Sequence, residues 1–488
     1  MRTTPQRLWR WARLATLLGA LLALAACTTP DLPQTREDFA TDLPADTYDS
    51  GRFADEFPMH FDSYAANLER AGDRQSKLVV GVEPDLPMLW ANYPFAKGYN
   101  FPRPHPLGFE DVTGTPRISD ASVGSCLTCK STTVPLLIDE MGEDYWGASF
   151  LDEIAPRVEE LAAEGGHEDL GEFGHVGIGC ADCHDPQTMD LRISRPSFLN
   201  ARERQGVDHL AEATRNDMRS DVCGQCHVNY YFHPDTQKVT FPWDEGFRPE
   251  DQLEVHQTTA REGGFEADWI HGVSGAPMVK TQHPEYELWT YGTHGAAGVS
   301  CTDCHMPAQR IDGQKMTVHN WESPIASEEN ITRSCGQCHA DRSTAELRER
   351  VGLVQDSTIE ALHDAQEVSV QSHYHVNRMI TAGVDEERVT EAQELIRQAQ
   401  FLWDFIAAAN GDGFHNHSAS IDTLRKSSDL SNEAIRIATE ELSANGVDMD
   451  ELREEIDNIV DEVYAADEEV KHEFVNNDFF PPMGDYHD

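Results

Sequence analysis

Five pairs of cysteines constrain this chain more than any other feature of its sequence. In each pair two residues separate the cysteines, and four of the five pairs are followed at once by histidine. On one helical turn, cysteines three residues apart project to the same side and can form thioethers with both vinyl groups of one haem. The cysteines are Cys126/Cys129, Cys180/Cys183, Cys223/Cys226, Cys301/Cys304 and Cys335/Cys338.

The histidine after a pair is placed to reach the haem iron as an axial ligand. The competing hypothesis is structural zinc, in which such pairs combine into four-sulfur sites. Zinc does not need a histidine after every pair, so the repetition favours haem. Only Cys27 lies outside the pairs, which leaves no disulfide framework. The predicted proximal ligands are His184, His227, His305 and His339.

The first pair breaks the pattern, because Lys130 follows Cys129. Either this site is a remnant without haem, or Lys130 ligates iron through its neutral amine. Ligation requires desolvation and the charge of the metal to lower the pKa of the lysine. The intact cysteines favour a haem. An axial lysine opposite an empty position would give an open iron at which a small substrate can bind.

The N-terminal segment resembles an export signal. Residues 1–26 contain four arginines, no acid and an apolar run from Leu14 to Ala26, and this run is too short to be typical of a membrane span. Leu24-Ala25-Ala26-Cys27 resembles a bacterial lipoprotein cleavage box with Cys27 as the lipidated residue; the alternative is ordinary signal-peptidase cleavage. Thr28 after the cysteine is typical of lipoproteins directed to the outer membrane. Residues 27–58, acidic and proline-containing, are predicted to form a flexible tether.

The charge of the chain excludes one class of function. A formal net charge of −48 disfavours nucleic-acid binding, which needs a basic surface. The negative charge of the whole chain repels anions, so an anionic substrate would have to be attracted by positive charge close to its site. Hydrophobic residues make up only 39% of the chain, so cofactors are expected to fill much of the interior.

The predicted fold is mainly α, with little β-structure and long C-terminal helices. Residues 59–345 form the haem-binding region, in which 228–243 could form a small hairpin that turns at Pro234-Asp235. Residues 346–488 show helical spacing of apolar residues, as at 395–406 and 452–463, and Ser431 is a candidate N-cap. These helices would pack on a core or on a second subunit.

One Lys-type pair followed by four His-type pairs resembles the pentahaem cytochrome c nitrite reductases that form ammonia. The resemblance runs from about residue 89 to 416 and includes RSDVCGQCHVNYYF at 219–232, FPWDEG at 241–246 and GAPMVKTQHPEYELW at 275–289. YPFAKGYNFPRPH at 93–105 and GFHN at 413–416 also match. The resemblance implies a six-electron reduction of nitrite at the Lys130 haem, with the other four haems relaying electrons.

The resemblance also implies the residues that contact substrate. The family's arginine, tyrosine and histidine fall on Arg117, Tyr230 and His283. A permanent positive charge suits nitrite, a phenol can donate a hydrogen bond, and an imidazole can transfer protons. Without the resemblance, Arg117 could equally be a surface residue, Tyr230 a core residue and His283 a turn residue.

The second axial ligands follow from the same resemblance. They are His105 for the haem on His227, His294 for that on His339, His319 for that on His184 and His415 for that on His305. His417, two residues after His415, is the alternative for the last.

The family commonly binds calcium beside the active site. Tyr230 (through its backbone), Lys280 (through its carbonyl) and Gln282 match the family's ligands, but Asn229 replaces a glutamate. An asparagine still offers an oxygen without the charge, so a calcium bound more weakly is expected.

Two other functions stay open: an electron-transfer cytochrome with no substrate, or a reductase of hydroxylamine or sulfite. The implied partners are nitrite, an electron-donating cytochrome and a second copy of the chain. The donor would be a quinol-oxidising membrane cytochrome or a soluble haem protein.

Overall fold

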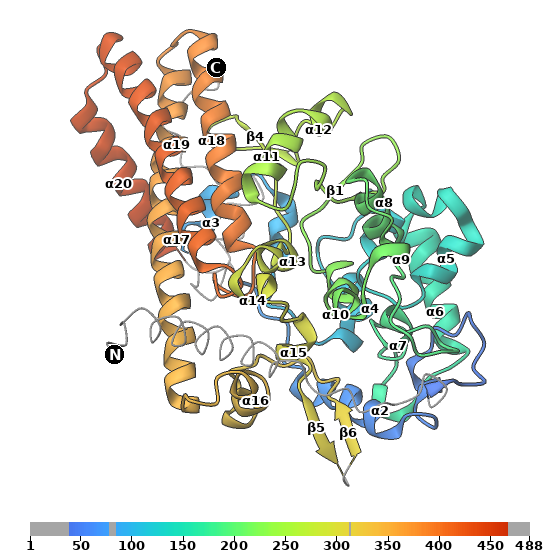
Figure 1. The fold of residues 1–488 in the computed structure, drawn as a ribbon. Coiled ribbons are helices and arrows are strands. Elements are labelled where there is room, and N and C mark those ends of the chain that lie inside the picture. The colour runs from blue at the N-terminus through green and yellow to red at the C-terminus, as the bar shows by residue number, and fades with distance from the viewer. Residues whose placement is uncertain (1–38, 78–83, 312–313, 467–488) are drawn as a thin grey trace, which may run out of the picture.

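The computed structural model describes residues 39–77, 84–311 and 314–466. The expected export signal over residues 1–26 and Cys27 lie outside this part. Figure 1 shows two regions side by side: a bundle of long helices from the C-terminal part of the chain, and a region of short helices and loops that carries the cysteine pairs. No helix in the described ranges combines the length and apolar character that a bilayer crossing needs.

The region before residue 344 is built from short helices joined by loops. They are α2 (Pro58–Ala65), α3 (Leu86–Leu89), α4 (Gly108–Thr113), α5 (Val134–Met141), α6 (Ala155–Ala163), α7 (Cys180–Cys183), α8 (Pro196–Arg204), α9 (His209–Glu212), α10 (Arg215–Gly224), α11 (Pro249–Gln257), α12 (Thr259–Glu262), α13 (Glu285–Thr290), α14 (Thr293–Ala296), α15 (Cys301–His305) and α16 (Glu328–Arg333). A core of buried apolar side chains, among them Phe109, Phe150 and Trp243, lies within this region.

Three two-stranded antiparallel hairpins account for the strands of the described ranges. They are β1 (Tyr231–Phe232) with β2 (Val239–Thr240), β3 (Trp269–Ile270) with β4 (Pro277–Met278), and β5 (Ala308–Ile311) with β6 (Gln314–Thr317). The first lies where the sequence predicts a hairpin. The mainly α fold with little β-structure is confirmed.

The long helices are α17 (Thr344–Thr381), α18 (Glu386–Ala407), α19 (His417–Ala444) and α20 (Met449–Ala465). On α20 the apolar side chains at 452, 456, 459 and 463 are buried, as their spacing predicts. The N-cap prediction at Ser431 is wrong, because that residue is fully buried in the middle of α19. Asn416 caps this helix by accepting a hydrogen bond from the backbone of Ala419.

The folded body begins earlier than expected. The prediction of a flexible tether as far as residue 58 is wrong for its described part, since Phe53 is only 1% exposed. Phe53 and Leu43 pack against Ala181, between the cysteines of the second pair. Asp49 caps the turn over Ser50–Phe53. Two apolar anchors therefore outweigh the acidic composition of this segment.

A buried pair of histidines joins the second hairpin to the helical bundle. His271, in the turn between β3 and β4, stacks on His373 of α17 with ring centres 3.7 Å apart. The His373 Nε2 lies 3.0 Å from the Gln400 Oε1, and its Nδ1 lies 2.8 Å from the Ser274 Oγ. This contact fixes the hairpin whose second strand leads into residues 280–283.

We expect His373 to make the fold sensitive to acid. Burial lowers the pKa of His373 from its ordinary value to about 3. The unfolded chain therefore takes up a proton that the folded chain excludes, so this stability is complete above pH 6.5 and is lost as the pH falls towards 3. Between pH 7.5 and 5 the His373→Asn variant should lose about 2 kcal/mol less unfolding free energy than the unmodified protein. Denaturant unfolding at both pH values measures this, and equal losses in the two proteins would contradict it.

Candidate active site and cofactor cavity

Each cysteine pair lies on a single helical turn or at its end, as thioether attachment to one haem requires. Four pairs begin or lie in short helical segments, and the third starts in the last turn of α10. The segments are the turn Gly124–Leu127, α7, α10, α15 and the turn Cys335–Gln337. The predicted arrangement of the sulfur atoms therefore has a local structural basis at all five sites.

The Lys130 turn differs from the others in its winding. The backbone N–H of His184 donates to the carbonyl of the first cysteine of its pair, four residues back, and so do those of His227 and His339. The N–H of Lys130 instead donates to Leu127, three residues back, at 2.7 Å. The first site is thus a tighter, 3₁₀-like turn. The first site therefore differs from the others in its backbone conformation as well as in the residue that follows the second cysteine.

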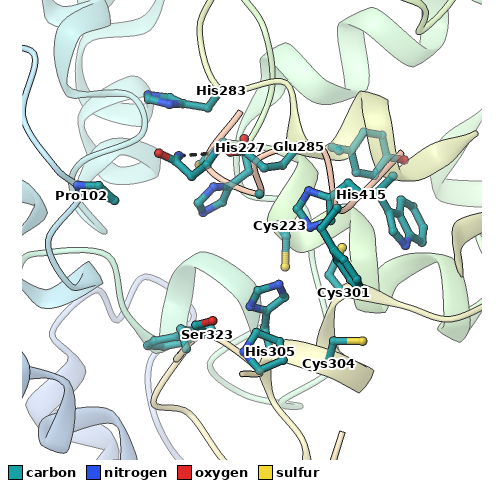
Figure 2. Close-up of a pocket in the computed structure, with 18 of the residues that line it drawn as sticks. Pro102, Cys223, His227, His283, Glu285, Cys301, Cys304, His305, Ser323 and His415 are labelled. Atoms are coloured by element: carbon teal, nitrogen blue, oxygen red, sulfur yellow. Dashed lines mark hydrogen bonds between the residues drawn. The ribbon is translucent and has the colours of Figure 1, made fainter. Parts of the chain in front are cut away.

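A continuous cavity of about 1890 Å³ lies among the cysteine pairs. It is larger than the ~300–1,000 Å³ of an ordinary small-molecule pocket, so it has room for more than one cofactor. Nine of the ten paired cysteines line it; Cys180 does not. Figure 2 shows His227, His305 and His415 around the opening with Cys223, Cys301 and Cys304.

The structure brings histidines together in four pairs whose spacing fits haem iron. Two iron–nitrogen bonds of about 2 Å, with about 1.1 Å from each nitrogen to its ring centre, place the ring centres of two axial imidazoles about 6.2 Å apart. The observed ring-centre distances are 6.0 Å for His105/His227, 6.3 Å for His184/His319, 6.5 Å for His294/His339 and 6.3 Å for His305/His415. These four pairs are the ones that the resemblance implies.

Neighbouring carbonyls orient several of these rings. The Nδ1 of His184 lies 2.8 Å from the Met189 carbonyl, and the Nδ1 of His319 lies 2.9 Å from the Thr317 carbonyl. A hydrogen bond at Nδ1 leaves Nε2 free for a metal. His417 has its Nδ1 3.1 Å from the Thr358 hydroxyl. The ring-centre distance of 6.3 Å between His305 and His415 favours His415 over His417 as the ligand.

Lys130 is held close to the start of α4. A Cβ atom on Gly108 would lie 2.5 Å from the Lys130 carbonyl oxygen, so only glycine permits this approach. The Lys130 side chain is exposed to the cavity that Cys126 and Cys129 also line. The backbone is therefore fixed while the amine faces open space.

Arg117, Tyr230 and His283 line the same cavity as Lys130. The Arg117 Nε donates to the Phe95 carbonyl at 2.7 Å, and its guanidinium lies 5.4 Å from the centre of the Phe95 ring. No other side-chain hydrogen bond of Arg117 occurs within the described ranges, so both terminal nitrogens remain available to a ligand.

Burial controls the protonation of the other two groups. It raises the pKa of Tyr230, so the phenol keeps its proton and can donate it in a hydrogen bond. Burial, and then the positive charge of Lys130, lowers the pKa of His283 well below its ordinary value. The histidine is therefore neutral near pH 7, and Arg117 supplies the fixed charge.

The residues expected at calcium also lie together. The Asn229 Oδ1 accepts a hydrogen bond from the Gln282 backbone at 2.9 Å, and its Nδ2 donates to the Gln252 Oε1 at 2.8 Å. The Lys280 amine turns away from them towards α18, which leaves its carbonyl as the group it could offer. Neutral oxygen donors thus lie side by side, and these residues fit a hard cation that prefers oxygen.

Sequence analysis missed the residue that anchors Lys280 and Thr281. Asp404 of α18 is fully buried, and its carboxylate accepts from the Lys280 Nζ at 2.7 and 2.9 Å and from the Thr281 N–H at 2.9 Å. A buried carboxylate needs such a set of donors. Its position inside an amphipathic helix gave no signal, because the partner lies 124 residues away.

Comparison with known proteins agrees with this geometry. The family model for cytochrome c552 matches residues 49–482. The cytochrome c nitrite reductase subunit NrfA of Nitratidesulfovibrio vulgaris is 36% identical over 475 residues, which cover 89% of this chain and 87% of the relative. Cytochrome c-552 of Bacteroides thetaiotaomicron is 36% identical over 379 residues, covering 74% and 71%.

A solved structure has the same fold. The catalytic subunit NrfA of cytochrome c nitrite reductase from Desulfovibrio desulfuricans superposes with a TM-score of 0.72 at 32% identity. The match covers 84% of this chain and 91% of that one. Two calcium sites are described for that subunit.

Proposed function

Because this chain belongs to the cytochrome c552 family, we propose that it is a cytochrome c nitrite reductase that reduces nitrite to ammonium. The observation that carries the proposal is the gathering of Arg117, Tyr230 and His283 around the cavity that receives Lys130. A cytochrome that only transfers electrons needs neither an anion-binding group nor a proton donor beside one of its haems. The site therefore favours an enzyme.

The chain's own residues would hold five haem c groups. The cysteine pairs would form the thioethers, Lys130 would ligate the first iron, and the four histidine pairs would ligate the others from both sides. Bound there, the haem held by Lys130 would supply an iron at which nitrite is reduced, and the other four haems would supply electrons.

The residues around Lys130 bind and orient the substrate. The Arg117 guanidinium attracts nitrite and can donate two parallel hydrogen bonds to its oxygens. Tyr230 and His283 donate hydrogen bonds from half-buried positions, where such bonds are stronger than in water. Reduction of nitrite to ammonium consumes six electrons and eight protons and releases two waters, so proton delivery by these groups is part of the work.

An assay with reduced viologen tests this function directly. The expected result is one ammonium formed per nitrite consumed, with six one-electron donors oxidised. Hydroxylamine and sulfite should be offered separately at the same concentration. Failure to form ammonium from nitrite, or faster turnover of sulfite, would overturn the assignment.

We propose that the protein works in the periplasm, attached to a membrane through a lipid on Cys27. The charged, apolar character of residues 1–26 supports export, and haem c attachment suits an exported protein. Mass spectrometry of the mature N-terminus tests the lipid. Electrons would come from a quinol-oxidising membrane cytochrome or a soluble haem protein.

We also propose a homodimer formed through the long helices. Ile380 of α17 is 44% exposed and Tyr464 of α20 is 42% exposed. Apolar side chains at such positions suit a helical interface. Sedimentation of the holoprotein measures the mass, and a monomer at micromolar concentration would contradict the proposal.

We expect one calcium ion at Asn229, Gln282 and the carbonyls of Tyr230 and Lys280. A chelator should remove it and lower the rate of nitrite reduction, and added calcium should restore the rate. The Asn229→Glu variant regains a carboxylate, so it should hold calcium on the order of tenfold more tightly. Unchanged metal content and unchanged rate after chelation would count against this site.

A further inference from the structure

Arg195 is a fully buried charge that the mechanism above does not use. Its exposed fraction is 0%, and it precedes Pro196 at the start of α8. Its backbone is extended, as the residue before a proline prefers. Burying a guanidinium is costly unless its donors find partners. The partners of Arg195 therefore show what the charge is there to hold.

Two of these partners are carbonyls on either side of Lys130. The Arg195 Nε donates to the Thr128 carbonyl at 2.5 Å, and the Nη2 donates to the Ser131 carbonyl at 2.8 Å. A planar guanidinium fixes both bonds in one geometry, which the single ammonium of a lysine cannot do. Arg195 thus clamps the turn that carries the axial amine.

The charge of Arg195 is balanced from the next haem-binding motif. The Nη2 lies 2.5 Å from the Asp182 Oδ1, and Asp182 is 3% exposed. The other carboxylate oxygen of Asp182 accepts from the Gly179 N–H at 2.7 Å, at the start of α7. The ion pair therefore joins the turn of Lys130 to the second cysteine pair.

A third motif joins the same cluster through Gln225. Its Oε1 accepts from the Arg195 N–H at 3.1 Å, and its Nε2 donates to the Asp182 carbonyl at 2.9 Å. Thr128, Asp182 and Gln225 each stand immediately before the second cysteine of their pair. In three motifs, the residue before the second cysteine thus contributes to one hydrogen-bonded cluster that joins the motifs.

We propose that Arg195 is a positioning residue for Lys130. It holds the turn so that the amine faces the iron of the haem attached at Cys126 and Cys129. The inference rests on the proposed function, because it assumes that Lys130 is an iron ligand.

The Arg195→Lys variant of the holoprotein tests the clamp. It keeps the positive charge but loses the planar set of donors that binds the Thr128 and Ser131 carbonyls together. The nitrite kcat should fall on the order of 100-fold, as expected for a misplaced catalytic group, with KM unchanged. The high-spin signal of the oxidised Lys130 haem should shift or disappear, while the signals of the four histidine-ligated haems stay the same. An unchanged high-spin signal and kcat would overturn the proposal.

Two further variants guard against a trivial loss of folding. Arg195→Gln combined with Asp182→Asn removes both charges, so no unpaired buried charge remains; the high-spin signal of the Lys130 haem should again shift or disappear, because the planar clamp is lost. Arg219→Lys is the matched control, because Arg219 contacts Asp303 at 2.5 Å at the equivalent place in the fourth motif. It should leave the Lys130 signal unchanged, and the same loss in both lysine variants would contradict a specific role of Arg195.

The proposed function fails separately from this inference. Absence of ammonium formation by the unmodified protein would refute nitrite reduction, whereas the spectrum of the Lys130 haem reports on the clamp without turnover. Ammonium formation together with an Arg195→Lys variant that matches the unmodified protein would refute only the role of Arg195.

Discussion

Replacing Lys130 with alanine is expected to reduce nitrite turnover to the background rate of the assay. The amine is the only protein group that the chain offers to the first iron at the position where the other four motifs place histidine. Without it, the haem on Cys126 and Cys129 loses its fixed ligand and takes up water or a stray side chain, so the free position is no longer presented to substrate. The spectra of the four histidine-ligated haems should stay intact, since their ring pairs do not involve this residue.

The Lys130→His variant separates loss of the ligand from loss of the haem. Histidine restores an axial nitrogen and the motif of the other four sites, so five haems should be counted by mass spectrometry. Activity should recover in part, because the imidazole is shorter than the lysine side chain and the turn at Leu127 is tighter than at the other sites. Normal activity in Lys130→Ala would end the assignment of the active haem.

Replacing Arg117 with alanine should mainly weaken nitrite binding. A hydrogen bond to a charged group contributes about 1.5–3 kcal/mol, so the KM for nitrite should rise roughly 10- to 100-fold, with a much smaller change in kcat. The positive charge of Arg117 acts on the phenol of Tyr230, where it opposes the rise in pKa that burial causes. The net charge of −48 makes a local cation more important, because the rest of the chain repels anions.

The Arg117→Lys variant is the matched control for charge. It keeps the cation but loses the planar pair of donors and the bond to the Phe95 carbonyl. Its KM should lie between those of the unmodified protein and the alanine variant. Equal KM values for the alanine variant and the unmodified protein would contradict a substrate-binding role.

The sequence predicts the local features of this protein well. Each cysteine pair sits on a helical turn because spacing along a chain is itself local information. The hairpin at 231–240 and the apolar face of α20 follow from local patterns for the same reason. The wrong N-cap at Ser431 shows the limit: a serine inside a long amphipathic helix resembles a cap until the packing of α19 between α17 and α18 is known.

Long-range contacts could not be derived from the sequence alone. His105 faces His227 across 122 residues, so that pairing was available only through a family resemblance. Arg195 and Asp404 belong to no motif, and their importance appears only when their buried partners are seen. The tether was misplaced because two apolar side chains, Leu43 and Phe53, outweigh the composition around them.

The most direct test of the account is electron paramagnetic resonance of the fully oxidised holoprotein, before and after addition of nitrite. One high-spin ferric haem should be present beside four low-spin haems, and its signal should be lost when nitrite binds. A spectrum of five low-spin haems with imidazole on both sides, or a protein with only four attached haems, would contradict the claim that Lys130 holds an iron open to substrate.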